Sequence, residues 1–377
     1  MAGRLERCHR CRLQLVVPPE ARSFRCHVCH AVTVVQSHDP NFLANKQVKQ
    51  AATWFKALIS NISSSNNPYT SMAMNSPPQQ YWYQLPPRQL PYPQVYGKKR
   101  ALLCGINYRS RSYELKGSVN DVQCMKYLLC DKFGFSEDCI LVLTEEERDP
   151  YHIPTKKNMR MAMQWLVMNS QPGDSLVFHY SGHGSRQINF SGEEADGYDE
   201  TLCPLDYETE GMILDDEINA TIVRPLQRAV KLHAIIDACH SGTVLDLPFL
   251  CRMSRTGFYQ WEKHGTELNK GTNGGFAVAF SGCDDNQTSA DTTALSGNTM
   301  TGAMTYCFIQ AVNSEIGITY GRILNSMRST IRDAATGIRV TGPIASFIRQ
   351  VFGAGLKQEP QLSATEQFDV YRTPFFI

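Results

Sequence analysis

A segment that is rich in proline and almost free of charge constrains how this chain of 377 residues can fold. Between residues 61 and 96, Arg88 is the only charged residue, and seven prolines lie between Pro68 and Pro93. This composition cannot form a packed core and favours an extended, polyproline-like backbone. We therefore predict a small module over residues 1–37, a disordered linker over residues 38–97 and a globular domain over residues 98–377.

The charge balance and the cysteine content limit the class of protein. The 37 Lys and Arg against 36 Asp and Glu give a net charge of +1, so there is no whole-chain electrostatic case for nucleic acid or an anionic membrane. The N-terminus has no apolar leader, and the apolar runs near residues 101–106, 176–180 and 232–236 are too short to span a bilayer. We expect a soluble protein of the cytoplasm, with the nucleus as a second compartment.

Four of the 13 cysteines form a metal-binding pattern close to the N-terminus. Cys8, Cys11, Cys26 and Cys29 have the spacing C-x2-C, fourteen residues, C-x2-C, which fits a tetrahedral zinc site with four thiolate ligands. A segment this small needs the metal for most of its folding free energy. Disulfides and redox-active C-x2-C pairs are the alternatives; a reducing compartment disfavours the first, and the absence of a βαβ context disfavours the second.

The charge of this module bears on its partners. Residues 1–37 hold six Arg and two Glu, but four thiolates around a zinc ion would reduce the positive charge to a modest value. We therefore favour protein docking or autoinhibition over nucleic-acid binding. Protein partners of the zinc module and of the proline-rich arm are expected.

From about residue 98 the chain alternates apolar runs rich in branched residues with segments of helical periodicity. This pattern is typical of βα units and predicts an α/β fold, with a mostly parallel central sheet and helices on both faces. The expected strands are Arg100–Ile106, Cys139–Leu143, Ser175–Tyr180, Leu232–Ile236 and Phe276–Phe280. The expected helices are Ser118–Phe133, Thr155–Asn169, Asp215–Val223, Gly302–Val312 and Tyr320–Ala334.

Two of these strands are followed by residues that could take part in catalysis. His183 follows one strand between two glycines, and Cys239 follows another, so both are expected at the carboxyl-end rim of the sheet. A free thiol is mostly protonated at neutral pH, and an adjacent imidazole can accept its proton during attack or hold it beforehand, then deliver it to the leaving amine. A buried strand cysteine and a turn histidine are the alternatives for each residue taken alone.

The motifs around these residues resemble those of a known family. The segments Ser181–Gly184, Asp237–Gly242 and Ser281–Asp291 are similar to motifs of type I metacaspases, which are caspase-fold cysteine peptidases. The N-terminal module, with Arg12, Leu15, Ala21 and Val32, resembles the plant lesion-simulating-disease type zinc finger. The resemblance implies a His183–Cys239 dyad, a thioacyl intermediate, cleavage after Arg or Lys, and a role in programmed cell death or stress.

The family also implies a division of the globular domain and a source of backbone hydrogen bonds. We expect a large-subunit-like part over residues 98–250, a connector over residues 251–273 and a small-subunit-like part over residues 274–377. The backbone N–H groups of Gly184 and Cys239 are the expected oxyanion donors.

Acidic residues near the dyad give a physical reason for a basic substrate. Asp237 precedes Cys239 by two positions on the same side of its strand, and Asp121 follows the first strand. In the family, the corresponding carboxylates line the primary specificity pocket with the serine that matches Ser181. Such a pocket favours a guanidinium or ammonium group. Asp121 could instead be an acid in the first turn of a helix. Many relatives have cysteine in place of Ser118, so this wall of the pocket differs in shape or polarity.

The chain between the two dyad residues becomes acidic, which suits calcium. Resemblance to calcium-activated type I metacaspases implies ligands at Asp199, Asp215, Asp216 and Asp246. A solvated acidic loop and a helix N-cap are the alternative from composition alone. Calcium would then act as a switch that orders the loops beside the site.

The connector contains basic residues that an enzyme of this specificity could cut. The candidates for self-cleavage are Arg252, Arg255, Lys263 and Lys270. The predicted function is a calcium-activated, self-processing cysteine endopeptidase with a zinc module and with protein or peptide substrates. A catalytically silent zinc-finger scaffold, or a regulatory protein that acts through the zinc finger, is the alternative.

Overall fold

The computed structural model divides the chain into two compact units, Met1–Pro77 and Pro78–Ile377. The residues that it describes are 4–7, 14–17, 23–25, 32–34, 90–93, 98–188, 197–239, 241–254, 257–264, 270–282, 303–314, 317–336 and 360–377.

The first unit contains two small antiparallel sheets. Strand β1 (Arg4–Arg7) pairs with β2 (Gln14–Val17), and β3 (Ser23–Arg25) pairs with β4 (Val32–Val34). The four cysteines predicted to bind zinc lie outside the described residues. The zinc site therefore stays a prediction.

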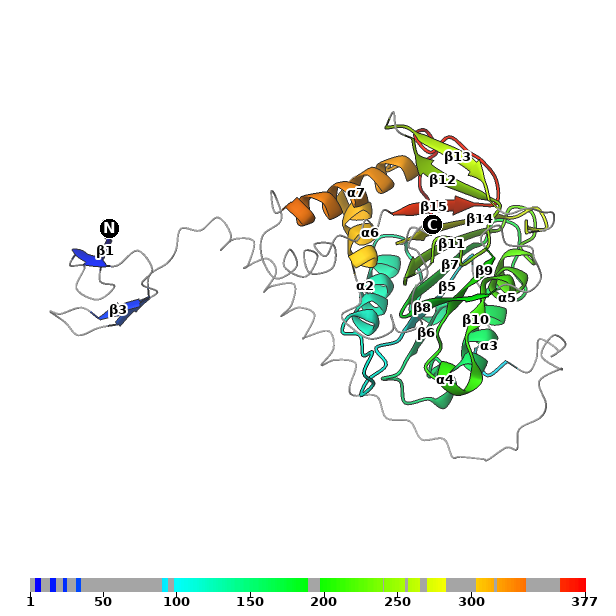
Figure 1. Ribbon diagram of the computed structural model, residues 1–377, viewed down its shortest axis with the longest axis horizontal. Coiled ribbons are helices and arrows are strands. Elements are labelled where there is room, and N and C mark those ends of the chain that lie inside the picture. The colour runs from blue at the N-terminus through cyan, green and yellow to red at the C-terminus, as the bar shows by residue number, and fades with distance from the viewer. Residues whose placement is uncertain are drawn as a thin grey trace. The chain divides into compact units, whose positions relative to one another are not determined.

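The second unit is built on an eight-stranded sheet (Figure 1). Its order is β13-β12-β15-β14-β11-β7-β5-β6. The parallel part consists of β5 (Lys99–Gly105), β6 (Ile140–Thr144), β7 (Ser175–Ser181), β11 (Lys231–Asp237) and β14 (Phe276–Ser281). The antiparallel extension consists of β15 (Gln361–Ala364), β12 (Phe249–Met253) and β13 (Tyr259–Lys263).

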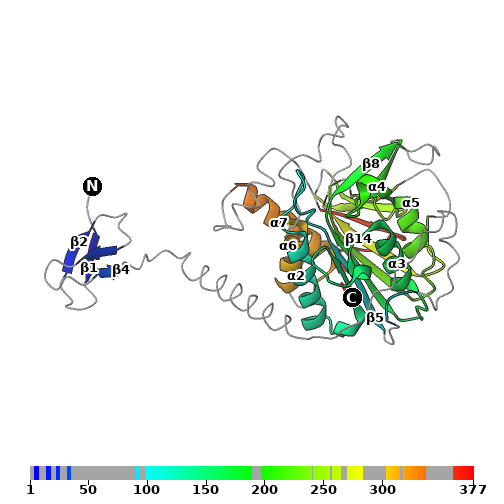
Figure 2. The same ribbon diagram turned by 90° about the horizontal axis from the view of Figure 1, so that it is seen from below.

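Helices cover both faces of this sheet, as the alternation of strand and helix patterns predicts (Figure 2). One face carries α2 (Ser118–Asp131), α6 (Ala303–Ser314) and α7 (Tyr320–Thr336). The other carries α3 (Lys156–Val167), α5 (Asp215–Ile218) and the π-helical turn η5 (Asn219–Val223). The mostly parallel α/β fold is thus confirmed. The helix expected over Asp215–Val223 changes from α to π geometry at Asn219.

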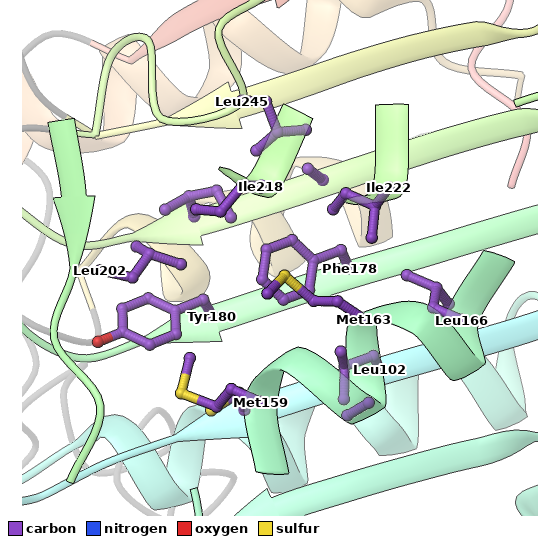
Figure 3. Packing of buried hydrophobic residues seen from close by; sticks show 14 of the residues in the cluster. Leu102, Met159, Met163, Leu166, Phe178, Tyr180, Leu202, Ile218, Ile222 and Leu245 are labelled. Carbon is purple, nitrogen blue, oxygen red and sulfur yellow. The ribbon is translucent and has the colours of Figure 1, made fainter. Parts of the chain in front are cut away.

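The central strands are buried on both faces, which explains their continuous apolar runs. In β5, Leu102 and Cys104 belong to the core beneath α3, whereas Ala101 and Leu103 belong to the core beneath α2 and α6. Figure 3 shows the first core, in which Met159 and Met163 of α3 lie over Leu102 and Phe178. These two cores hold the carboxyl ends of the central strands in place.

Shorter elements lie around the sheet. A second sheet has the order β10-β9-β8, with β8 (Gly184–Ile188), β9 (Tyr198–Leu202) and β10 (Ile213–Leu214). The short helices are η3 (Glu137–Cys139), η4 (Pro150–His152) and α4 (Tyr207–Glu210). In the described parts of the chain, every helix is too short or too polar to cross a bilayer.

The end of the predicted linker is packed, which corrects its boundary. Tyr92 is only 6% exposed, and its hydroxyl donates to the carbonyl of Asn158 at 3.1 Å. The indole N–H of Trp165 donates to the carbonyl of Pro93 at 2.9 Å. Residues 90–93 therefore belong to the second unit rather than to a disordered linker. Because the segment is almost free of charge, its composition did not predict that Tyr92 packs against α3.

The connector expected over residues 251–273 is also not simply an exposed loop. It contains most of β12 and all of β13, which pair with each other and extend the sheet. Buried Cys251 and Tyr259 join the core on the α6 side. The exposed polar residues Gln260, Glu262 and Lys263 belong to β13, the edge strand of this hairpin.

Candidate active site

His183 and Cys239 follow neighbouring parallel strands, β7 and β11, in which Ser181 is paired with Asp237. The backbone N–H of Gly182 donates to the carbonyl of Asp237 at 3.2 Å. Gly184 lies so close to the carbonyl of Cys239 that a Cβ atom there would overlap it. The chain segments that carry the two predicted dyad residues are therefore in direct contact at one rim of the sheet.

A backbone carbonyl determines the tautomer of His183. Its Nε2 lies 2.8 Å from the carbonyl oxygen of Tyr113, which can only accept a hydrogen bond. Nε2 therefore carries the hydrogen, and Nδ1 of the neutral ring is left as the acceptor. Burial lowers the pKa of His183, although the Tyr113 carbonyl partly opposes this shift, so the neutral ring is favoured.

The loop between β5 and α2 supplies groups that the sequence analysis missed. Tyr113 provides the carbonyl described above, and Tyr108 packs on the imidazole with 4.7 Å between ring centroids. The phenol of Tyr108 also accepts a hydrogen bond from the backbone N–H of His183 at 3.0 Å. Aromatic residues in a loop have no spacing pattern that would reveal these contacts in advance.

Two carboxyl groups are buried together near the two predicted dyad residues. Asp121 is 6% exposed and Asp237 is 3% exposed, and Asp121 accepts a 2.7 Å hydrogen bond from the Ser181 hydroxyl. Burial, then the negative charge of Asp237, raises the pKa of Asp121 well above its ordinary value. The backbone N–H of Thr305, near the start of α6, donates to Asp237 at 2.7 Å. A bound cation would relieve this electrostatic penalty.

The other predicted pocket residue is also buried. Ser118 begins α2 and is fully buried, and its hydroxyl has no hydrogen-bond partner among the residues that the structure describes. The backbones of Gly184 and Cys239, the predicted oxyanion donors, lie against each other. The direction in which their N–H groups would act on a substrate stays a prediction.

Three of the four predicted calcium ligands form one cluster. The carboxylates of Asp199, Asp215 and Asp216 each offer an oxygen within 4.8 Å of the others. Burial, then the charge of Glu200, raises the pKa of Asp215 to about 9, with a smaller contribution from the fourth candidate, Asp246. Hard oxygens grouped in this way suit calcium. The residues present therefore fit the ion that the resemblance implies.

Lys270, one of the self-cleavage candidates, lies beside this acidic cluster. Its ammonium is 2.7 Å from Asp246 and 3.9 Å from Asp216, and its side chain is 12% exposed. The choice of Lys270 as a self-cleavage site stays a prediction, because cleavage after it would require its side chain to enter the specificity pocket. The acidic cluster holds that side chain instead.

The remaining self-cleavage candidates differ from one another. Arg252 lies inside β12 and is paired with Gln260 of β13, one residue beyond the last pair of β12 with β15. Lys263 ends β13, the last strand of the sheet, and is exposed. Arg255 lies outside the described residues. The sequence could not separate these cases because it does not reveal the hairpin pairing.

A mostly parallel α/β sheet with histidine and cysteine segments meeting at the ends of adjacent strands is the arrangement of a caspase-like cysteine peptidase. Comparison with known proteins agrees with this class. Residues 99–248 match the family model described as metacaspase, peptidase C14 domain. The chain is 55% identical to Metacaspase-1 of Arabidopsis thaliana, across 99% of this chain and 96% of that protein.

Two further relatives extend the comparison. Metacaspase-2 of Arabidopsis thaliana is 47% identical over 98% of this chain and 99% of its own length. Metacaspase-1 of Eremothecium gossypii is 37% identical over 74% of this chain and 66% of its own. The chain belongs to the metacaspase family of cysteine peptidases. Its full-length similarity to plant members confirms the resemblance to plant type I metacaspases.

Proposed function

We propose that this cysteine peptidase cleaves proteins after Arg or Lys, with Cys239 as nucleophile and His183 as base, and that calcium activates it. The contact between the segments that follow β7 and β11, beside two buried carboxyl groups, carries the proposal. The lowered pKa of His183 supports proton transfer during attack, since the neutral ring can accept the thiol proton.

The reaction then proceeds through a thioester. Nδ1 of His183 takes the proton of the Cys239 thiol while the sulfur attacks the carbonyl carbon of the scissile bond. The tetrahedral intermediate collapses, the C–N bond breaks, and the imidazolium gives its proton to the leaving amine. Water, deprotonated by His183, attacks the thioester; the acid leaves, and the proton returns to sulfur. Throughout, the Tyr113 carbonyl holds the Nε2–H, which keeps Nδ1 facing the reaction.

Specificity for a basic residue follows from Asp121 and Asp237. A guanidinium or ammonium group of the substrate would compensate their buried charge, whereas an acidic side chain would add to the repulsion. The Ser181 hydroxyl orients Asp121 through its hydrogen bond. Ser118 is the fourth residue proposed for this pocket.

Calcium would be held by Asp199, Asp215, Asp216 and Asp246. Bound there, the ion would supply positive charge that offsets these carboxylates, which come from β9, α5 and the segment that follows Cys239. The amide of Asn219, next to this cluster, contacts the carbonyls of Leu245 and Asp246 at 2.9 and 3.0 Å. These contacts support a calcium role in ordering the segment that follows Cys239, rather than in the proton transfers.

The same proposal includes self-processing, a structural zinc ion in residues 1–37, and a cytoplasmic or nuclear role in programmed cell death or stress. Among the self-cleavage candidates, the fold favours Lys263 over Arg252, since Lys263 is exposed and ends the outermost strand of the sheet. Mass spectrometry of the fragments formed with calcium tests this choice. Loss of the main fragment in Arg252→Ala, and not in Lys263→Ala, would contradict it.

The test of the proposed function is hydrolysis of the amide bond that follows Arg in a peptide with a reporter amine after the Arg, by wild type, Cys239→Ala and His183→Ala. We expect calcium-dependent activity in wild type alone. His240→Ala is a matched control that changes a histidine next to the nucleophile. An inactive wild type that folds and binds calcium would instead support the alternative, a silent zinc-finger scaffold.

A further inference from the structure

Two buried tyrosine hydroxyls hold the peptide groups on either side of His183. The Tyr108 hydroxyl accepts a hydrogen bond from the N–H of His183 at 3.0 Å, and the Tyr180 hydroxyl donates to its carbonyl at 2.8 Å. The two hydroxyls are 3.1 Å apart. Tyr108 also donates to the carbonyl of Cys203 at 2.5 Å. These contacts fix the backbone of His183 from both ends.

The surrounding chain leaves little room for another arrangement. Both tyrosines are almost fully buried, and a Cβ atom on Gly182 would come within 2.6 Å of the Tyr180 hydroxyl. Tyr108 adopts a left-handed φ of 52°, which is uncommon for a residue with a bulky side chain and occurs where surrounding contacts enforce it. Its own N–H is held by Glu145 at 2.8 Å. The loop geometry thus aims the Tyr108 hydroxyl at His183.

We propose that Tyr108 and Tyr180 are positioning residues for His183, an inference that rests on the proposed His183–Cys239 dyad. Tyr108 acts on both parts of the histidine, because its hydroxyl binds the backbone and its ring packs on the imidazole. Tyr180 acts on the backbone alone. Without these hydroxyls, the imidazole keeps its contact with Tyr113 but loses the fixed backbone that directs Nδ1 toward the thiol.

The experiment compares Tyr108→Phe and Tyr180→Phe with Tyr320→Phe. Tyr320 is a matched control, since it is equally buried and its hydroxyl lies 2.7 Å from Nε2 of His233, on the opposite side of the sheet from Tyr108. For the two site variants, we expect kcat on an Arg peptide to fall about tenfold with KM nearly unchanged, because small misplacements of a reacting group are costly. The rate of Cys239 alkylation by iodoacetamide should fall in parallel.

The outcomes separate this inference from the proposed function. Folded Tyr108→Phe and Tyr180→Phe with wild-type kcat and alkylation rates would overturn the positioning role. The positioning role would also be overturned if Tyr320→Phe lost as much kcat, per folded molecule, as the two site variants. An active His183→Ala variant, by contrast, would show that His183 is not the base, and the proposed dyad would then fail. Circular dichroism and thermal unfolding establish the folded fraction in each case.

A second, independent observation concerns the cation of the acidic cluster. The Lys270 ammonium lies 2.7 Å from Asp246 and 3.9 Å from Asp216, two of the carboxylates proposed to bind calcium. The backbone carbonyl of Lys270 is held by the amide of Asn219 at 3.1 Å. The chain therefore supplies a positive charge of its own to these carboxylates, from a backbone position that is anchored beside them.

We infer that Lys270 is an internal competitor of calcium and sets the calcium concentration at which the site fills, which deepens the proposed calcium activation. An ammonium and a divalent ion cannot share the same carboxylate oxygens at short distance. Calcium binding therefore requires the lysine side chain to leave, while Asn219 retains its backbone. In calcium-free protein, the same lysine limits the repulsion among the acidic groups.

Calcium binding measured by calorimetry on the full chain tests this role. Lys270→Met keeps most of the length of the side chain and removes its charge, and Lys270→Arg keeps the charge. We expect Lys270→Met to bind calcium about tenfold more tightly. The substitution removes a positive charge that lies within 4 Å of two of the proposed ligands in a partly buried site. Lys270→Arg should stay within threefold of wild type, and Lys270→Met in chelator should melt at a lower temperature.

The results again distinguish two failures. If wild type binds calcium and Lys270→Met binds it equally or more weakly, the competition is wrong and calcium activation still stands. If folded wild type binds no calcium at all, the proposed calcium role fails and the competition fails with it.

Discussion

At the scale of single residues, the buried pair Asp121 and Asp237 places a cost on the folded state that a basic substrate would remove. Burial and the Asp237 charge raise the pKa of Asp121 above its ordinary value of 3.8. Binding of a proton by Asp121 therefore stabilises the folded state. This stabilisation is fully present below the pKa of Asp121 in the unfolded chain and is lost as the pH rises through its pKa in the folded protein. This sign leads to a prediction about stability as well as activity.

Asp121→Asn should make the free energy of unfolding fall less steeply as the pH rises. The folded wild type keeps a proton that the unfolded chain has released, whereas the amide has none to lose, and its oxygen can still accept from Ser181. Urea unfolding at several pH values between about 5 and 9 measures the difference in slope. Parallel pH profiles for the two proteins would contradict the raised pKa.

The same substitution should weaken cleavage after Arg. Removal of one carboxylate from a buried cation site is expected to lower kcat/KM by about 10²-fold, the size of a lost charge-assisted hydrogen bond. Asp174→Asn is a matched control: Asp174 is buried too, but it precedes β7 at the other end of the strand. Equal loss in both variants would mean that Asp121 has no special place in substrate binding.

Gly184→Ala tests the close contact of the two chain segments. A Cβ atom at residue 184 would overlap the carbonyl of Cys239, so the loops must separate. We expect a loss of kcat of about 10²-fold, as for other small misplacements of reacting groups. Gly271→Ala is the control, because its Cβ would meet nothing within 4 Å. Activity in Gly184→Ala close to that of Gly271→Ala would argue against close packing at the site.

At the scale of elements, the central strands and most helices could be predicted because periodicity reports burial directly. Strands β7 and β11 are buried on both faces and therefore appear as mostly apolar runs, each interrupted by one buried histidine. The hairpin β12–β13 could not be predicted, because one strand lies at the sheet edge and its exposed polar positions resemble a loop. The contacts of Tyr113 and Lys270 depend on loop conformations that have no period.

The anchor at Tyr92 gives a prediction at this scale. Tyr92→Ala should lower the free energy of unfolding by about 3 kcal/mol, because a buried aromatic ring is replaced by a cavity next to Trp165. Tyr151→Ala is the control, since that tyrosine is 49% exposed. Chemical denaturation of the two variants provides the comparison, and equal stability would show that residues 90–93 are not anchored.

At the scale of the whole molecule, the sequence predicts a metal in each of two parts. About one zinc per chain is expected in the full-length protein and none in a chain that begins at residue 78, because all four cysteines precede that residue. Metal analysis after dialysis measures both. Cys8→Ser should lose zinc without losing the calcium bound by the second unit. Zinc retained by the shorter chain would contradict the predicted ligand set.

We propose that one thiol, one imidazole and two buried carboxyl groups make this chain a calcium-activated peptidase specific for basic residues. The most direct measurement is release of a reporter amine attached after Arg or after Asp in matched peptides, by the purified full chain, with calcium and with chelator. We predict cleavage of the Arg peptide only, with calcium only, and none by Cys239→Ala. Cleavage of the Asp peptide, or undiminished cleavage by Cys239→Ala, would contradict it.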